Sequence, residues 1–292
     1  MPSTRFFIHI IMPLLLINGL CSFPAKARVA VVYASPMGDE NWRMSGNRLR
    51  CGLALTIPDY GVAYFEQYAA KAPHFILHKW QQVERPLTAA VYANQPVWKP
   101  QGASHFIAKT VISPGKYGIY LKREAALKAL TYLAQGFQTR ISYQSEQGFP
   151  VSVSLSPIRF QTVYAKYQKC LGSLLPFDYA SVKTSVLLFE TDDDTLSDAG
   201  KRQLQHVAQY VREDHKVKRI SITGYADNRG RKSYNNAISE ARAVAVKRYL
   251  LQLRVRKDLL DTTWVGVNDP VASNDTEEGM AQNRRVVIII EK

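Results

Sequence analysis

The fold of this chain is decided by residues 219–251, RISITGYADNRGRKSYNNAISEARAVAVKRYLL, in which a strand, a polar turn and a helix follow one another. The opening residues alternate polar and apolar side chains, which is the pattern of a half-buried strand. The turn is rich in Asp, Asn and Gly, which favour tight turns. Ile238, Ala241, Ala245 and Tyr249 then recur at helical spacing, and we expect them to form the buried face of a helix.

The flanking sequence continues this alternation of strand and helix. Residues 184–190 are rich in β-favouring side chains, and apolar residues recur at helical spacing within residues 204–211. Residues 263–267 and 285–290 predict two further strands. The resulting βαβαβ-β order predicts a sheet with helices packed on one face. Together with a β-rich first part, this gives an α+β protein.

Four motifs in this region resemble those of the OmpA C-terminal family in their order and spacing. The resemblance covers residues 184–292 and implies a domain that binds the diaminopimelate of peptidoglycan stem peptides without covalent chemistry. Tyr225 and Ala226 replace the His and Thr that the family usually has, so one hydroxyl is missing. The motifs are Phe189-Glu190-Thr191-Asp192, Gly224-Tyr225-Ala226-Asp227-Asn228-Arg229-Gly230, Asn235-Asn236-Ala237-Ile238-Ser239-Glu240-Ala241-Arg242-Ala243 and Asn283-Arg284-Arg285-Val286.

The resemblance also implies which residues hold this ligand, whose free end carries an ammonium and a carboxylate on one carbon. Asp227 would pair with the ammonium, and Arg242 would form a bidentate contact with the carboxylate. Asn228 and Asn235 would supply neutral hydrogen bonds near the start of the helix. Two alternatives stay open: the turn has a purely structural role, or Arg242 pairs with Asp227 itself. Residues 283–285 are expected to order the domain edge rather than to hold the ligand.

The part of the chain before this domain is mainly β. Short β-favouring runs alternate with turn residues between residues 48 and 155, and residues 123–135 have the spacing of a helix. Weak patterning with Gly, Ser and Pro at residues 171–183 predicts a linker. We therefore expect two domains, residues 28–175 and residues 180–292.

Residues 1–27 have the pattern of a cleavable signal peptide. Arg5 precedes a short apolar run, and an Ala-Lys-Ala cleavage motif ends at residue 27. The alternative, a membrane anchor, is disfavoured because the run is short and contains a proline. Export leaves two of the three cysteines, Cys51 and Cys170, which predicts a disulfide in an oxidising compartment. The alternative is a pair of unbonded buried thiols.

Charge and residue spacing narrow the classes of function. Residues 28–179 hold 17 Lys and Arg against 8 Asp and Glu, a net charge of +9, whereas residues 180–292 hold 19 against 16, a net +3. Export disfavours nucleic acid as the partner of this basic surface. His74 and His78 lie four residues apart, but in a predicted strand rather than a helix, so we predict no metal site. Since no nucleophile–base pair is present either, we predict no enzyme and no cofactor.

An exported chain with a β-rich first domain, two cysteines and an OmpA-like end resembles the MotY family of flagellar motor proteins. This resemblance implies a periplasmic protein whose first domain joins the basal body in the T ring with a MotX-like partner. Its second domain would bind peptidoglycan, and the whole would support stator assembly and motor rotation. The alternative is an outer-membrane OmpA-type protein that anchors the envelope to peptidoglycan. The predicted helix at residues 123–135 and the charges within candidate strands disfavour it.

Overall fold

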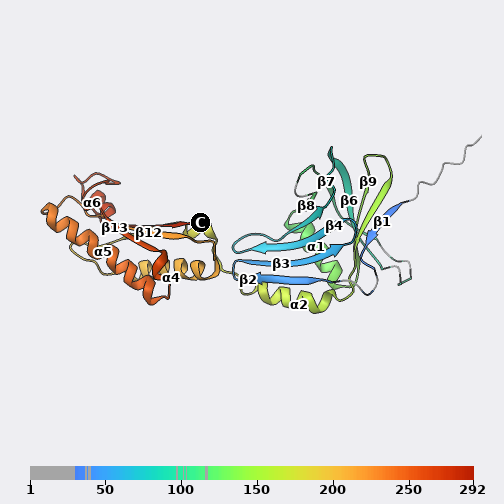
Figure 1. Ribbon diagram of the computed structural model, residues 1–292, viewed down its shortest axis with the longest axis horizontal. Coiled ribbons are helices and arrows are strands. Elements are labelled where there is room, and N and C mark those ends of the chain that lie inside the picture. The colour runs from blue at the N-terminus through green and yellow to red at the C-terminus, as the bar shows by residue number, and fades with distance from the viewer. Residues whose placement is uncertain are drawn as a thin grey trace, which may run out of the picture.

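The protein consists of two lobes arranged along its longest axis, each built on its own sheet (Figure 1). This computed structural model confirms the predicted α+β class, with a strand-rich first domain and a mixed second domain. The signal peptide predicted for residues 1–27 lies outside the described residues. Those residues are 30–36, 38, 41–96, 98–100, 102, 104–115 and 118–292.

The first lobe is built on a ten-stranded sheet, with neighbouring strands in the order β1-β10-β9-β6-β7-β8-β5-β4-β3-β2. Only β1 and β10 pair in parallel; the other neighbours are antiparallel. The strands are β1 (Val31–Ala34), β2 (Arg43–Asn47), β3 (Arg50–Ile57), β4 (Gly61–Tyr68), β5 (His74–Lys79), β6 (Leu87–Asn94), β7 (His105–Ile112), β8 (Ile119–Leu121), β9 (Gln138–Gln144) and β10 (Pro150–Leu155).

Period-two alternation divides this sheet into a buried face and an outward face. In β6, Ala89, Val91 and Ala93 are buried, while their neighbours along the strand are partly or fully exposed. The buried face packs against α1 (Arg123–Ala134), which contributes Ala and Leu side chains at helical spacing. The helix predicted at residues 123–135 is therefore confirmed. Full burial of each leucine side chain stabilises the fold by about 1.5–3 kcal/mol.

A second helix, α2 (Phe160–Leu171), lies against β2 and β3. A disulfide in its last turn links it covalently to β3. The predicted disulfide is present between Cys51 and Cys170, with their Cα atoms 5.9 Å apart. A Cβ atom at Gly46 of β2 would lie 2.8 Å from Cys170 Sγ, so only glycine fits beside the bond. The disulfide therefore ties β3 to α2 within one core.

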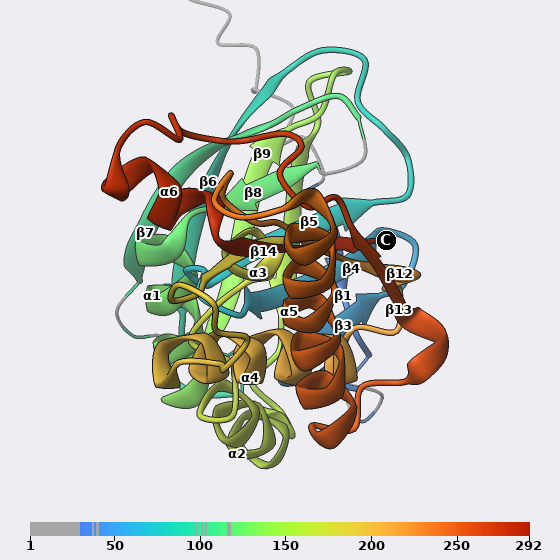
Figure 2. The same ribbon diagram turned by 90° about the vertical axis from the view of Figure 1, so that its left-hand side faces the viewer.

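The second lobe is a four-stranded sheet in the order β11-β14-β12-β13, with its two long helices packed on one face (Figure 2). Only β12 and β13 pair in parallel. The strands are β11 (Thr184–Leu188), β12 (Arg219–Gly224), β13 (Leu260–Trp264) and β14 (Arg285–Glu291). The helices are α3 (Tyr179–Val182), α4 (Asp198–Glu213), α5 (Lys232–Gln252) and α6 (Glu277–Asn283), with a 3₁₀ turn at Lys257–Leu259.

The buried face of α5 differs from the predicted one. The predicted apolar positions 238, 241, 245 and 249 are only half-buried, so this prediction was wrong. The polar Ser239 and Arg242 can point inward because main-chain groups of neighbouring loops form hydrogen bonds with them. Gly224 allows close approach, since a Cβ atom on it would overlap the carbonyl of Ser239. The buried residues of α5 are Asn235, Ser239, Arg242, Ala243, Val246 and Leu250.

The segment between the lobes is packed, although its sequence predicts a linker. Leu175 and Phe177 are buried in the core of the second lobe, and the Leu175 N–H donates to the carbonyl of Arg48 at 2.8 Å. At the end of α4, the Glu213 carboxylate accepts a hydrogen bond of 3.4 Å from the N–H of Arg48. The connection is therefore held by contacts with both lobes.

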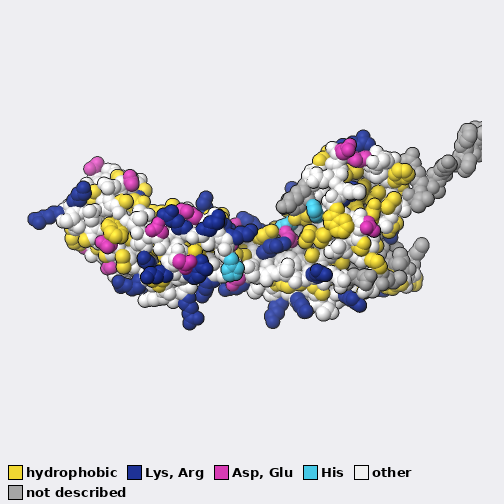
Figure 3. Space-filling model, in the orientation of Figure 1, with side chains coloured by type: hydrophobic (Ala, Val, Ile, Leu, Met, Phe, Trp, Pro, Cys, Tyr) yellow, Lys and Arg dark blue, Asp and Glu magenta, His cyan; other side chains and the backbone are white. Residues whose placement is uncertain are grey.

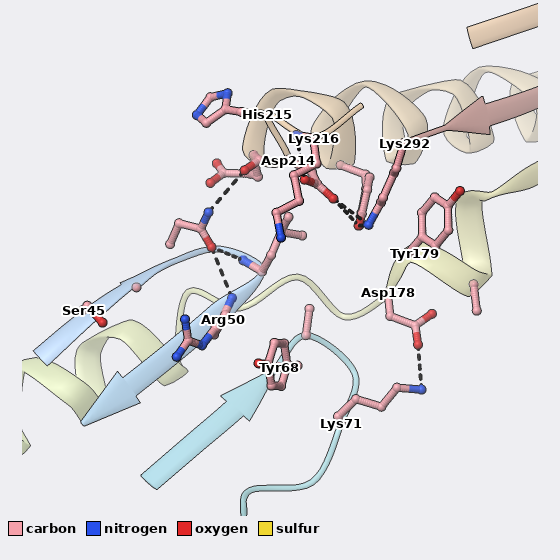
Figure 4. Close-up of a pocket in the computed structure, with 17 residues that line it drawn as sticks. Ser45, Arg50, Tyr68, Lys71, Asp178, Tyr179, Asp214, His215, Lys216 and Lys292 are labelled. Carbon is pink, nitrogen blue, oxygen red and sulfur yellow. Dashed lines mark hydrogen bonds and ion pairs between the residues drawn. The ribbon is translucent and has the colours of Figure 1, made fainter. Parts of the chain in front are cut away.

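An open hollow of about 930 Å³ lies between the lobes at this connection (Figure 4). Its lining carries two ion pairs: Lys71 with Asp178 at 2.6 Å, and Lys292 with Asp214 at 2.7 Å.

The basic side chains are not gathered into one patch. On the face shown in Figure 3, Lys and Arg side chains are scattered over both lobes. None of the helices in the described part of the chain is both long and apolar enough to cross a membrane.

Candidate functional site

A cavity of about 190 Å³ opens at the end of the second lobe where β12 stops and α5 begins. Three separate parts of the chain meet there: the loop after β11, the turn between β12 and α5, and the start of β14. We call it the α5 cavity. It is lined by Thr191, Asp192, Ala226, Asp227, Arg229, Gly230, Tyr234, Asn235, Ile238, Arg242 and Arg284.

Asp227 is buried at the base of this cavity and is paired with two arginines. Its Oδ2 atom accepts hydrogen bonds from Arg229 Nη2 at 2.8 Å and from Arg284 Nη1 at 3.0 Å. Its Oδ1 atom accepts the main-chain N–H of Arg229 at 3.1 Å. Burial raises the pKa of Asp227, but the hydrogen bonds from these arginines outweigh burial and hold the pKa below its ordinary value. The carboxylate is therefore ionised at neutral pH.

Arg242 is 1% exposed, and its guanidinium group bonds to main-chain oxygens. Its Nε atom donates to the carbonyl of Asp193 at 2.9 Å, Nη1 to Tyr225 at 3.2 Å and Nη2 to Glu190 at 2.9 Å. Burial and the Arg284 charge lower the pKa of Arg242, against a raising effect of nearby acidic groups. Among the described residues, no carboxylate forms an ion pair with it. Since a guanidinium has five N–H donors, two remain for a ligand.

The start of α5, about 15 Å along the helix axis from the Cα atom of Arg242, adds a second group of donors. The helix begins at Lys232 without a side-chain cap, so the main-chain N–H groups of its first turn lack helical acceptors. Such a terminus carries partial positive charge and favours an anion. Opposite it, the exposed Asp192 carboxylate accepts a hydrogen bond of 3.1 Å from the Tyr234 hydroxyl. The cavity thus offers both an anion-binding and a cation-binding side.

The structure brings together three of the four residues predicted from the sequence. Asp227, Asn235 and Arg242 line the α5 cavity, and Asn235 and Arg242 share a face of α5 as expected. Asn228 lies exposed on the turn and is not part of the lining. Arg242 does not pair with Asp227 in the described structure; Arg229 and Arg284 do.

The three residues 283–285 lie in different positions relative to the cavity. Arg284 lines the cavity and binds Asp227, and its Nε atom also donates to the carbonyl of Phe189 at 3.1 Å. Asn283 does order the edge, by accepting the N–H of Val271 at 2.8 Å. Arg285 stacks on the Tyr225 ring, with its guanidinium carbon 3.7 Å from the ring centre. Arg229 and Tyr234 also line the cavity but were not predicted as site residues. Arg229 lies inside the turn motif and Tyr234 just after it, so their positions could have indicated them.

The described residues contain no cluster of His, Cys, Asp and Glu suited to a metal ion. His74 instead stacks between two rings of the first lobe, with centroid distances of 6.1 Å to Tyr68 and 5.3 Å to Tyr120. The α5 cavity therefore offers hydrogen-bonding groups and charged side chains of both signs.

Two family models match the chain, one on each lobe. The MotY N-terminal domain matches residues 33–176, and the OmpA family matches residues 188–284. The chain is similar to the sodium-type flagellar protein MotY of Vibrio parahaemolyticus, with 28% identity over 92% of this chain and 94% of that protein. It is 39% identical to outer membrane protein A of Bordetella avium, over 35% of this chain and 52% of that protein.

Two solved structures match little more than a third of the chain. The peptidoglycan-associated lipoprotein of Burkholderia pseudomallei is 33% identical and is matched over 36% of this chain and 89% of its own, with a TM-score of 0.35. The C-terminal domain of Helicobacter pylori MotB is 23% identical and is matched over 37% of this chain and 84% of its own, also with a TM-score of 0.35.

Proposed function

Because the chain is a MotY-type flagellar protein, in which a MotY N-terminal domain is followed by an OmpA-family domain, we propose that it links a flagellar basal body to peptidoglycan. It acts in the periplasm after cleavage of residues 1–27, and it is not an enzyme. Residues 180–292 bind peptidoglycan, while residues 28–175 bind the basal body with a MotX-like partner. Joining the two contacts raises the local concentration of each site for its target, which supports stator assembly and rotation.

The ligand at the wall is the free end of diaminopimelate in a stem peptide. Its carboxylate binds the two remaining N–H groups of Arg242 and lies near the positive end of α5. Its ammonium joins the ion-pair network of Asp227, and the exposed Asp192 supplies a further carboxylate beside it. Asn235 contributes a neutral hydrogen bond from the helix.

The observation that carries this proposal is the burial of Arg242, which forms no ion pair with a carboxylate of the described residues. A buried charge is costly unless it is paired, and main-chain carbonyls compensate only part of that cost. A ligand carboxylate completes the pairing and offsets the cost of burying the cation. A purely structural Arg242 would hold the three loops together but would have no use for the ligand's carboxylate.

Pelleting of the full-length chain with insoluble peptidoglycan tests the wall contact. Arg242→Lys should bind roughly a hundredfold more weakly, because removing a hydrogen-bonded charge contact costs a few kcal/mol and an ammonium cannot form the planar fork. Arg248→Lys is the matched control, since Arg248 lies exposed on the same helix. Unchanged binding by Arg242→Lys would contradict the assignment.

The choice of wall material separates the ligand role from a structural one. Peptidoglycan with lysine in place of diaminopimelate keeps the free ammonium but lacks the carboxylate beside it. The unaltered protein should therefore bind it much more weakly than diaminopimelate peptidoglycan. Equal binding to both materials would show that Arg242 does not bind the ligand's carboxylate.

A second experiment tests the contact with the basal body. A full-length fusion to a periplasm-competent fluorescent protein should be concentrated at flagellar bases. A uniform fluorescence signal would contradict this contact.

A further inference from the structure

The outward face of the first sheet carries a groove of about 570 Å³ across β6, β7, β9 and β10. Strand register places its side chains in rows. One row runs Phe106–Tyr92–Arg140, since Tyr92 pairs with both of the others. The groove lies on the opposite face of the sheet from α1. In Figure 1, β6, β7 and β9 occupy the part of the first lobe that is remote from the second lobe.

Small side chains form the floor of this groove. In the next row, Ala90 of β6 pairs with Ser142 of β9, which pairs with Ser152 of β10. Lys109 of β7 pairs with Ala90 and lies at the β7 end of this row. The taller row contains an aromatic pair, Tyr92 and Phe106, with ring centroids 5.6 Å apart. The groove therefore has a floor of small side chains, and a row of larger side chains borders it.

The groove is positively charged, and no acidic side chain of its described lining offsets this charge. Arg140 and Lys109 line it, and Arg140 also lines an adjoining hollow of about 360 Å³ that includes Lys99. Among the described residues, neither lining contains an Asp or Glu. The Nε atom of Arg140 and the Oγ atom of Ser152 are buried without a hydrogen-bond partner in the described structure. Buried polar atoms normally have partners, so both point to a missing acceptor.

We propose that this groove is the docking surface for an extended, acidic segment of a basal-body protein; this rests on the function proposed above for residues 28–175. Arg140 receives one carboxylate of the segment and Lys109 a second. These positions lie two strands and one row apart, which is about 12 Å between Cα atoms for ordinary sheet spacings. An extended chain covers this distance in roughly four residues, so acids at i and i+4 fit both cations.

The shape of the groove favours a peptide over a membrane surface. A flat anionic bilayer cannot reach a floor that lies below Tyr92 and Phe106, whereas an extended backbone can lie over Ala90, Ser142 and Ser152. Aromatic residues and arginine are also the side chains enriched in protein interfaces. The groove and the α5 cavity lie in different lobes, so both can be occupied at once.

The test uses the full-length chain and a fluorescein-labelled peptide of alternating Glu and Ala residues, with fluorescence anisotropy as the readout. Lys109→Glu and Arg140→Gln should each weaken binding about tenfold or more, since both remove a charge contact. Lys109 is exposed, so its variant leaves the core untouched. The matched control is Lys166→Glu with Lys169→Glu, on the exposed side of α2. Ser142→Trp fills the groove without changing charge and should also weaken binding.

Three results would overturn the inference. They are equal binding by the groove variants and the control, unaltered binding by Ser142→Trp, and stronger binding of the unaltered chain to phosphatidylglycerol vesicles than to the peptide. In cells, a Lys109→Glu, Arg140→Gln fluorescent fusion should lose its collection at flagellar bases while the α2 control keeps it. If the groove variant still collects there, the groove inference fails and the proposed function stands. If even the unaltered fusion is uniformly distributed, the proposed function itself fails.

Discussion

Replacing Cys51 and Cys170 with alanine should lower the free energy of unfolding of the first domain by about 5 kcal/mol. The bond joins residues that are 119 positions apart. Closing a loop of this length removes chain entropy from the unfolded state, which the loop-entropy relation converts to about 5 kcal/mol at 25 °C. Since domains are typically stable by about 5–15 kcal/mol, the loss would take a third or more of the total.

Tryptophan fluorescence during urea unfolding measures this change in the first domain. Trp42 is 5% exposed and packs against Phe160 of α2, with ring centroids 5.0 Å apart, so its emission reports that core. Trp264 of the second domain is 42% exposed and contributes a smaller change. For a slope of about 2 kcal/mol per molar urea, the midpoint should fall by roughly 2.5 M. The unfolding transition of the second domain should stay in place.

Reduction provides the internal control for this experiment. Dithiothreitol should move the midpoint of the unaltered protein to that of the double alanine variant, and it should leave the variant itself unchanged. A shift of less than about 1 kcal/mol with an unchanged slope would refute the entropic reasoning, because the loop length would then have no consequence. A changed slope would instead show residual structure in the unfolded chain.

Two further predictions concern the second domain. Gly224→Ala should destabilise it by several kcal/mol in thermal unfolding, because the new Cβ atom overlaps the carbonyl of Ser239, while Gly172→Ala, where the nearest atom is 3.6 Å away, should be tolerated. The pKa of Asp227 is lowered in the folded state, so its stabilising contribution is present above the unfolded pKa of about 4 and is lost as pH falls through the lower folded pKa. Asp227→Asn should therefore flatten the acid side of the stability profile; an identical profile in the variant would show that Asp227 does not titrate as described.

The sequence was sufficient for those features that depend on local patterning. The helix at residues 123–135 and the strand-helix order of the second domain follow from period and turn chemistry, and the structure confirms them. The disulfide could be predicted because the predicted removal of residues 1–27 leaves only two cysteines. By contrast, β2 has a single large apolar residue, Met44, and its strand conformation depends on pairing with β3 through a turn held by Asn47. No local pattern indicates such a strand.

The details of the candidate site depend on contacts between distant residues, which local reasoning cannot supply. The buried face of α5 was misjudged because Asn235, Ser239 and Arg242 are polar, and hydrophobic periodicity assigns polar residues to solvent. The ion pair between Asp227 and Arg284 joins residues 57 positions apart. Only the pairing of β14 with β12 brings these two residues together.

The Cys51–Cys170 bond also determines how a pulling force would travel through the molecule. The chain leaves the first lobe from the end of α2, directly after Cys170, and enters the second lobe through Leu175. Without the bond, tension on this segment would peel α2 from the sheet one turn at a time. With it, the load passes through sulfur into β3, whose ladder of hydrogen bonds with β4 is strained in parallel rather than bond by bond. If the chain anchors the motor as proposed above, the disulfide is a mechanical coupling as much as a thermodynamic one.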